Sequence, residues 1–476
     1  MKRILLSFII IFIFSCENLL LEEPKGLVTG ENAVNSVEGL QAVLSGAYRP
    51  MQNNFTSGYT WSAMQAVGMG GDDLTTHPAS NKAEFRQLDQ FNVSDLNSRM
   101  TAIWNGGYKS IQGSNNIINN YKLAPQGPKV NQILGEAYFL RAFNYYWLVR
   151  IWGDIPLITS PNYSEEIKTI SKSKPAEVYK LIESDLNQAI NLLQNTKTQP
   201  GRSSKGAAKA LLADVYLTQS GWPLKDASKL PLAASLAKEV IDNKASFNFD
   251  LATYSTLWTN TIQNTPTKEE VFALQNCGSC SWSNGNSMYG QSPQPGDEGG
   301  WDDYFPEINF FNSFPEGPRK EAYFYTSFKN NTIPWTKSVT KHPYYKKFMV
   351  PGQWFTSQSL ILMRYAHVLL IYAEAKAKSG GPDQAAYDAV NAIRSRAGLP
   401  ALSGLSTNEF IEAVINERAW EFAGEGTSRW FDLTRLERVE AANANKDPNE
   451  LKLLGPVKVY LPIPASEVAL NPNLGK

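Results

Sequence analysis

Apolar residues recur at spacings of three and four positions over long stretches at both ends of the sequence. This period is that of amphipathic α-helices, and it leaves little room for any fold other than packed helices. The spacing predicts helices over residues 34–52, 98–121, 132–152, 175–193, 206–219 and 231–243, and again over 360–378, 384–397 and 407–423. We therefore expect a fold dominated by α-helices.

Alanines gather in the paired helical stretches, where small side chains let two helices approach closely. They are Ala207, Ala208, Ala210, Ala213, Ala233, Ala234 and Ala237 in one pair, and Ala373, Ala375, Ala377, Ala385, Ala386, Ala389 and Ala392 in another. Pairs of about 34 residues with small residues at their crossings are typical of tetratricopeptide-like units, which stack because one unit cannot bury its apolar face alone. We expect one domain over residues 31–476, with a helical scaffold over 31–247 and 359–476.

The stretch 248–358 lacks the helical period and alternates Gly, Pro, Asn and Ser with aromatic residues. So long an irregular segment inside a folded chain is more often functional than disordered when it is rich in aromatics. We expect it to form a loop-rich insert that packs on the scaffold and binds the ligand.

The N-terminus has the features of an export signal. Lys2 and Arg3 precede an apolar run over residues 4–14, which is too short to span a membrane as a helix. The run ends at Ser15 and Cys16, as in lipoprotein signals, so we predict a signal peptide over 1–15, lipidation of Cys16 and a tether over 16–30. An ordinary secretory signal with a chance cysteine is the alternative.

The charge balance and the sequence motifs argue against several classes of function. The 45 basic and 45 acidic residues balance, and the absence of a basic block argues against a nucleic-acid partner. The Gly-rich stretch 68–73 lacks the lysine of a phosphate-binding loop, and no nucleophile-elbow or zinc-protease motif occurs. Cys277 and Cys280 predict a small local disulfide in an exported protein, with a free thiol pair as the next reading. We expect no cofactor and no metal.

Glu417, Glu421 and Glu425 lie one helical turn apart, at a spacing that could suit acid–base cleavage of a glycosidic bond. The aromatic residues around them indicate core packing instead, and the sequence offers cations to pair the acids. The candidate cations are Arg394, Arg396, Arg418 and Arg429. We predict structural ion pairs and no catalysis. Arg141 and Asp154 are interpreted as a further structural pair.

Five ordered blocks carry a resemblance to a known family. They are GEAYFLRAFNYYWLVRIWGDIPL over 135–157, RYAHVLLIYAEA over 364–375, NAIRSRAGLP over 391–400, NERAWEFAGEGTSRWFDL over 416–433 and LPIPASEVALNPNL over 461–474. The chain resembles the SusD/RagB family. The resemblance implies a tetratricopeptide-like, cell-surface lipoprotein of the outer membrane that captures oligosaccharide and delivers it to a SusC-like TonB-dependent transporter.

The aromatic residues of the insert are the candidate ligand contacts, because an exposed aromatic face can stack on a sugar ring. The candidates are Trp301, Tyr289, Trp282, Tyr304 and Trp335, with Asp72 and Asp73 as acceptors for sugar hydroxyls. Trp301, Tyr289 and the two aspartates also resemble positions used by starch-binding relatives. The alternative is that each aromatic residue fastens a loop to the scaffold.

Three other functions stay open at this point. A peptide-uptake lipoprotein would keep the fold and change the ligand. A glycoside hydrolase would act through the helix of Glu417, and an assembly scaffold would bind no small ligand.

Overall fold

The computed structural model describes residues 33–53, 57–77, 81–161, 167–277, 288–289, 291–350, 355–447 and 453–476. Cys16, Cys280 and Trp282 lie outside the described residues, as do the predicted signal peptide and tether. Within the described parts helices dominate, as the apolar spacing predicts.

Most of the described helices belong to the two ends of the chain, and those described in between are short. The helices are α1 (Val37–Tyr48), α2 (Trp61–Gly68), α3 (Ala83–Asp89), α4 (Ser98–Asn120), α5 (Pro128–Trp152), α7 (Pro175–Leu192), α8 (Lys205–Gln219), α9 (Lys229–Asp242), α10 (Lys244–Phe247), α11 (Tyr254–Ile262), α12 (Ile308–Ser313), α13 (Pro318–Tyr323), α14 (Tyr365–Gly380), α15 (Gln384–Arg396), α16 (Thr407–Glu421), α17 (Ser428–Arg435), α18 (Val439–Ala444) and α19 (Ala465–Leu470). The 3₁₀ turns used below are η6 (Gly296–Glu298) and η8 (Lys346–Phe348).

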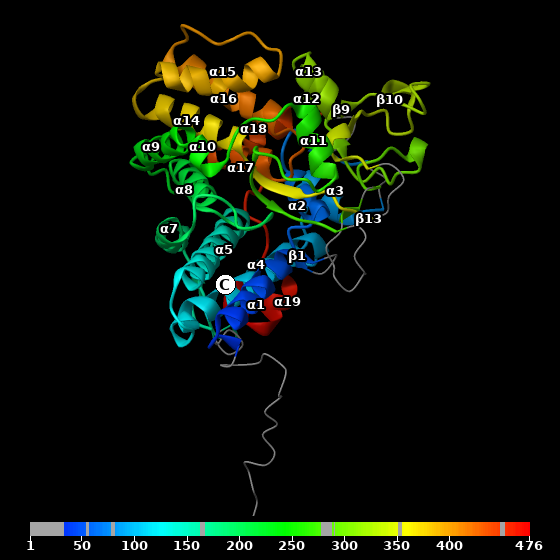
Figure 1. The fold of residues 1–476 in the computed structure, drawn as a ribbon. Coiled ribbons are helices and arrows are strands. Elements are labelled where there is room, and N and C mark those ends of the chain that lie inside the picture. Colours follow the sequence, from blue (N-terminus) through cyan, green and yellow to red (C-terminus); the bar gives the residue numbers. More distant parts are fainter. Residues whose placement is uncertain are drawn as a thin grey trace, which may run out of the picture.

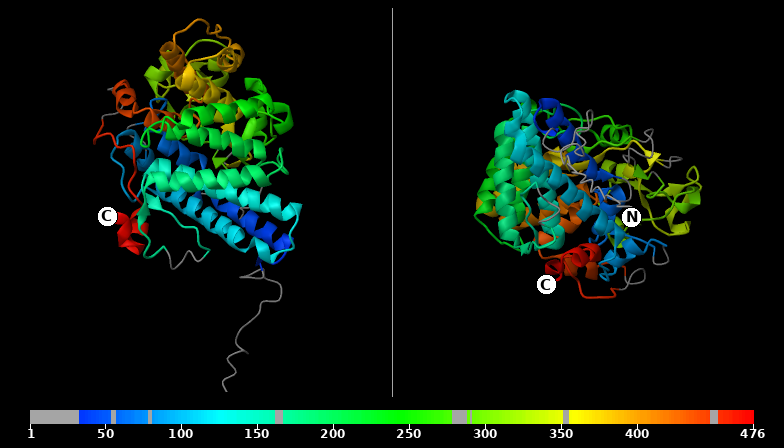
Figure 2. Two further views of the ribbon diagram at one scale, coloured as in Figure 1. Left: turned by 90° about the vertical axis from the view of Figure 1, so that its left-hand side faces the viewer. Right: turned by 90° about the horizontal axis from the view of Figure 1, so that it is seen from below.

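The long helices stack in chain order. Helix α4 packs on α5, α5 on α7, α7 on α8 and α8 on α9, and α14 then packs on α9, α15 and α16. Figures 1 and 2 show this curved stack, with the loop-rich part lying against one side of it. The alanines fit this role, because Ala213, Ala237 and Ala373 are fully buried where the helices meet. The scaffold of helical pairs is therefore confirmed.

Helix α5 illustrates how the sequence produces this scaffold. Pro128 stands in its first turn, where the missing N–H costs nothing, and Gly153 ends it with a φ of +72°. Between them nearly every side chain is buried, because α1, α4 and α7 all pack against the helix. An apolar helix without a polar face is what this central position requires.

One predicted helix begins too early. Residues Leu360–Arg364 form strand β14, which pairs antiparallel with β6 (Glu270–Leu274), and α14 starts only at Tyr365. A short apolar run such as LILMR fits a buried strand as well as a helical turn, and its partner lies about 90 residues away in the sequence. The apolar spacing therefore could not separate the two elements.

The middle segment is irregular as expected, but it contains α11, α12, α13 and several very short strand pairs. Two-residue strands occur both in the scaffold and in the middle segment. Those of the scaffold are β1 (Gln52–Asn53), β2 (Ser57–Gly58), β3 (Leu74–Thr75), β4 (Ile155–Pro156) and β5 (Lys172–Ser173). Those of the middle segment are β7 (Met288–Tyr289), β8 (Phe305–Pro306), β9 (Phe324–Tyr325), β10 (Ser327–Phe328), β11 (Ile333–Pro334), β12 (Tyr344–Tyr345) and β13 (Phe355–Thr356). They pair as β1–β2, β3–β8, β4–β5, β7–β13, β9–β12 and β10–β11, all antiparallel. Phe311, Phe324 and Phe348 of this segment join the same apolar core as the scaffold helices.

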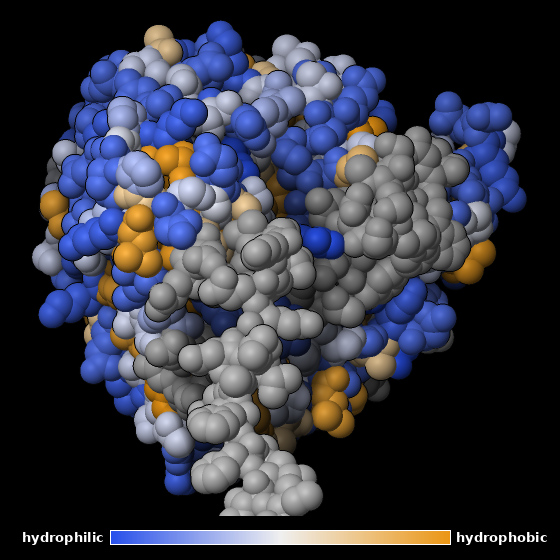
Figure 3. Space-filling model, turned by 60° about the horizontal axis from the view of Figure 1, so that its bottom comes forward, coloured by the Kyte–Doolittle hydropathy of each residue, from blue (hydrophilic) through white to orange (hydrophobic). Residues whose placement is uncertain are grey.

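Two further findings concern the chemistry of the chain. Cys277 is disulfide-bonded, while Cys280, its predicted partner, lies outside the described residues. Among the described helices, none has both the length and the apolar content needed to cross a membrane. The face in Figure 3 is mostly hydrophilic where it is not grey, with hydrophobic groups in small separate patches.

Candidate functional site

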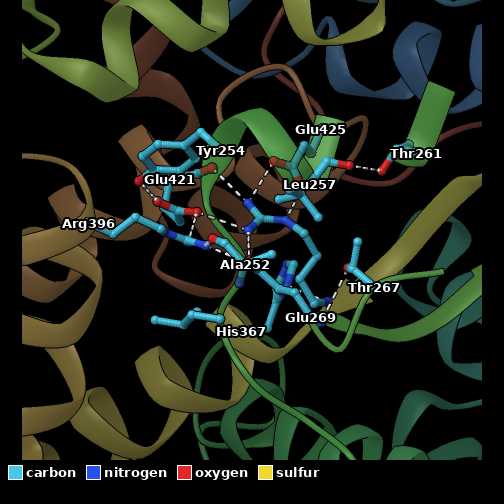
Figure 4. A network of polar contacts seen from close by, with 12 residues as sticks. Ala252, Tyr254, Leu257, Thr261, Thr267, Glu269, His367, Arg396, Glu421 and Glu425 are labelled. Atoms are coloured by element: carbon cyan, nitrogen blue, oxygen red, sulfur yellow. Dashed lines mark hydrogen bonds and ion pairs between the residues drawn. The ribbon is translucent and has the colours of Figure 1, made fainter. Parts of the chain in front are cut away.

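A buried network of ion pairs joins the middle segment to the scaffold. Glu421, at the end of α16, lies at its centre and accepts hydrogen bonds from Arg364 at 2.9 Å and from Arg396 at 2.7 Å. Arg319, from α13 of the middle segment, donates to the other oxygen of Glu421 at 3.2 Å. Figure 4 shows Glu421, Glu425, Glu269 and Arg396 converging on this point.

The other three carboxylates of the network are paired as completely. Glu417 lies between Arg319 and Arg394, and Glu269 lies between Arg364 and Arg396. Glu425 accepts from Arg364 and also from the Nζ of Lys347, which is 2.8 Å away. These acids are buried, so each depends on its cations rather than on water for stabilisation.

The electrostatics of Glu421 exclude it as a general acid. Burial alone would raise the pKa of this carboxyl, but the charges of Arg396, Arg364 and Arg319 outweigh burial and hold the pKa well below its ordinary value. A general acid in glycoside hydrolysis needs a pKa raised toward neutrality. The prediction of structural ion pairing is thus confirmed.

The partners differ in part from those predicted. Arg394 and Arg396 do pair with these acids, but Arg418 pairs with Asp432 and Arg429 pairs with Asp72. Arg319 and Lys347 come from the middle segment, and Arg364 ends strand β14. Of the three, only Arg364 stands in one of the quoted sequence blocks.

The predicted pair of Arg141 and Asp154 is wrong. Nε and Nη2 of Arg141 each donate to the carboxylate of Asp185 at 2.7 Å, and Asp154 pairs with Lys174 instead. Asp154 follows Gly153 beyond the end of α5, so the Arg141 side chain meets the neighbouring helix α7 rather than its own C-terminal turn.

Asp72 and Asp73 form structural contacts. Nε and Nη2 of Arg429 donate to the two oxygens of Asp72 at 2.6 and 2.8 Å. Asp73 is buried, and its carboxylate accepts the backbone N–H of Gly424 at 2.8 Å. Burial is the main cause that raises the pKa of Asp73 to about 7. Asp72 therefore fastens the loop after α2 to helix α17, and Asp73 fastens it to the segment between α16 and α17.

Trp301 is placed differently, since its side chain is only half buried. Its backbone N–H donates to the carbonyl of Gln291 at 3.0 Å, and the Nζ of Lys82 lies 5.1 Å from its ring centroid. Lys82 also pairs with Asp303 at 3.0 Å, and Asp303 accepts the Ser292 hydroxyl at 2.6 Å. Trp301 thus lies beside the Lys82 cation, on a loop that these hydrogen bonds and this ion pair stabilise.

The other predicted aromatic contacts do not share this position. Tyr304 is fully buried and packs against Phe85, so its ring is not available for stacking on a ligand from solvent. Trp335 is partly buried and meets Phe311 edge to face at 5.7 Å. The backbone of Tyr289 pairs with Phe355 in the β7–β13 ladder, and Trp282 lies outside the described residues.

Lys82 is the residue at this loop that sequence reasoning missed. A single lysine after a polar loop gives no signal, because its neighbour Trp301 is more than 200 residues away in the sequence. The described residues contain no group of three or more His, Cys, Asp or Glu that could hold a metal ion.

Because the acids that might act on a glycosidic bond are buried and paired, the molecule falls in the class of non-catalytic binding proteins built on helical pairs. The model of the SusD family matches residues 65–476, and the chain belongs to this family.

Relatives match the chain over nearly its whole length. SusD-like protein P2 of Formosa agariphila is 29% identical, over 100% of this chain and 99% of that protein. The structure of a SusD homologue from Bacteroides thetaiotaomicron has a TM-score of 0.78 at 23% identity, covering 93% of this chain and 97% of that one. A laminarin-binding SusD-like protein has a TM-score of 0.73 at 24% identity, covering 91% and 97%.

Proposed function

We propose that this chain is a lipid-anchored protein of the outer-membrane surface that captures an oligosaccharide and delivers it to a SusC-like TonB-dependent transporter. The single observation that carries the ligand-binding part is the placement of Trp301. Trp301 is half buried on a loop, whereas Tyr304 is fully buried and Trp335 packs against the core residue Phe311.

The surroundings of Trp301 supply what a sugar site needs. An indole face stacks on the apolar face of a sugar ring, while the ammonium group of Lys82, 5.1 Å from the ring centroid, can donate to sugar hydroxyl groups. Because Asp303 also holds Ser292 and Lys82, the loop is ordered before a ligand arrives, and less conformational entropy is lost on binding.

The class of ligand is supported by the relatives. One similar structure is that of a laminarin-binding protein, and another was solved with a xylogluco-oligosaccharide. Anchoring rests on the predicted lipidation of Cys16, and the transporter partner rests on the family. Neither oligosaccharide is thereby assigned to this chain.

A glycan array probed with residues 17–476 tests the ligand class. We expect binding to one group of related glycans, and binding to peptides with no glycan bound would overturn the assignment. Purification of the full-length protein from its own outer membrane tests the partner. A TonB-dependent transporter should copurify in stoichiometric amount, and its absence under mild detergent would remove the delivery role.

A further inference from the structure

A cavity of about 910 Å³ opens between the middle segment and the scaffold, away from the residues around Trp301. It is lined by Leu251, Ala252, Thr253, Tyr254, Ser255, Trp258, Thr259, Ile262, Pro318, Glu321, Ala322, Lys346, Lys347, Ala392, Ser395 and Arg396. These residues belong to α11 and the turn before it, to α13, to η8 and to the end of α15. Its volume suits an oligosaccharide segment of a few rings.

The walls of the cavity combine aromatic and hydroxyl groups. Tyr254 and Trp258, which are 5% and 6% exposed, belong to the lining. The exposed residues Ser255 and Thr259 of α11 contribute hydroxyl groups to the lining, as does the exposed Ser395 of α15. Such a surface offers hydrogen bonds to a ligand that is itself rich in hydroxyl groups.

Behind this wall the buried network carries an excess of positive charge. Its carboxylates are Glu269, Glu417, Glu421 and Glu425, and its cations are Arg319, Lys347, Arg364, Arg394 and Arg396. The cations exceed the acids by one, and two of them, Lys347 and Arg396, line the cavity.

Some groups of the network are not fully compensated by their neighbours. Burial is the main cause that lowers the pKa of Lys347 to about 8, and the charge of Arg364 lowers it further against the attraction of Glu425. The Nε of Arg396 and the Nε and Nη2 of Arg319 are buried and have no hydrogen-bond partner among the described residues. At the rim, the exposed side chains of Lys346 and Glu321 carry opposite charges, so the rim does not neutralise the excess.

We propose that this cavity is a second ligand site, which binds a sugar residue carrying an anionic group, a uronate carboxylate or a sulfate ester. The inference rests on the proposed function in taking the ligand to be a glycan. The anionic group would approach Arg396 and Lys346, while ring hydroxyls meet Ser395, Ser255 and Thr259. A neutral sugar would leave the net positive charge of the network without a counter-anion, which gives the site its preference.

Calorimetry with three short probes of similar length tests the site: an oligogalacturonate, a sulfated carrageenan oligosaccharide and a neutral galacto-oligosaccharide. The first two distinguish carboxylate from sulfate. We expect at least one acidic probe to bind more tightly than the neutral one, with an affinity that falls as salt rises. Ser395→Glu and Lys346→Glu each place a negative charge at an exposed position of the lining, and each should weaken that binding by about tenfold or more.

The control variants separate this site from the one at Trp301. Gln384→Glu adds the same charge at the exposed start of α15, outside the cavity lining, and should change little. Ala392→Trp should block the cavity without adding charge, and Trp301→Ala should leave the acidic probe bound. Melting curves of all variants show that they fold.

Each outcome decides one question. Equal binding of acidic and neutral probes, or acidic binding that survives both Ser395→Glu and Ala392→Trp, overturns the second site. A neutral glycan that depends on Trp301 would then leave the proposed function standing. If no glycan of either kind binds, both proposals fail.

Discussion

Arg364 and Glu425 form a two-point ion pair in the centre of the molecule, with the guanidinium Nε and Nη2 donating to the two carboxylate oxygens at 2.9 and 2.8 Å. Arg364 ends strand β14, and Glu425 follows helix α16, so the pair joins two parts of the scaffold directly. Lys347, which belongs to the middle segment, forms an ion pair with the same carboxylate. The carboxylates at the end of α16 and just after it thus hold the fold together.

Replacing Glu421 by Gln should lower stability without removing any activity. The change leaves Arg364, Arg396 and Arg319 facing a neutral amide, and breaking a buried ion pair on one side costs about 3–5 kcal/mol. Chemical denaturation of the variant and the parent measures the free energy of unfolding.

Glu412→Gln is the matched control for that measurement. Glu412 pairs with Arg438 at the surface, where both side chains are largely exposed, so its loss should cost no more than about 1 kcal/mol. Equal losses of unfolding free energy in the two variants would show that burial does not determine how much these ion pairs stabilise the fold. A parent protein that releases reducing ends from a glycan, with Glu421→Gln folded but inactive, would restore the hydrolase reading.

The buried carboxyl of Asp73 should make stability depend on pH near neutrality. Its pKa rises from an ordinary 3.8 to about 7 in the fold, mainly through burial. The folded protein therefore binds more protons than the unfolded chain between these values, and the free energy of unfolding falls as pH rises from about 4 to about 7. A rise of this size corresponds to roughly 4 kcal/mol.

Asp73→Asn should flatten this part of the pH profile, because an amide still accepts the N–H of Gly424 and does not titrate. Asp242→Asn, at an exposed pair with Lys238, should leave the profile unchanged. Melting temperatures between pH 4 and pH 8 provide the measurement. If the parent and Asp73→Asn have parallel profiles, the carboxyl of Asp73 does not titrate in this range.

Cys16→Ala should release the protein from the outer membrane, because acyl chains on Cys16 would provide the anchor and each buried methylene contributes about 0.8 kcal/mol. Fractionation of cells that lack the partner transporter measures the effect. A variant that stays with the membrane fraction in those cells would show that lipid on Cys16 is not the anchor.

The sequence predicted the scaffold well because its evidence is local. The apolar period and Gly153 predicted this helix over 132–152 without any distant partner, although α5 begins four residues earlier, at Pro128. Strand β14 was missed because only its pairing with β6 distinguishes it from a helical turn. The boundary between β14 and α14 therefore depends on residues about 90 positions away in the sequence.

The site was predicted only in part for the same reason. Glu421 was recognised as an acid in a pairing environment, but Arg319 reaches it from a position 102 residues earlier and has no local signature. Tyr304 and Trp301 are three positions apart and both aromatic, yet one is fully buried and the other half exposed. Only the packing of the insert on the core separates them.

The last prediction concerns ligand capture at Trp301. Trp301→Ala should weaken binding of the cognate oligosaccharide while the fold survives, because the indole is half exposed and the core is built from other residues. Losing one main aromatic contact should cost roughly 2–4 kcal/mol, or about 30- to 1000-fold in affinity. Trp282→Ala and Tyr289→Ala should weaken binding less, if they lie at the ends of the same surface.

Lys82→Met keeps the length of the side chain and removes its charge, so it should have a smaller effect than Trp301→Ala, of about 1 kcal/mol. Calorimetry with the bound glycan and a melting curve for each variant decide between the roles. Normal binding by Trp301→Ala would move the site elsewhere on the insert, and a steep fall in its melting temperature would identify Trp301 as a residue that fastens the loop to the scaffold.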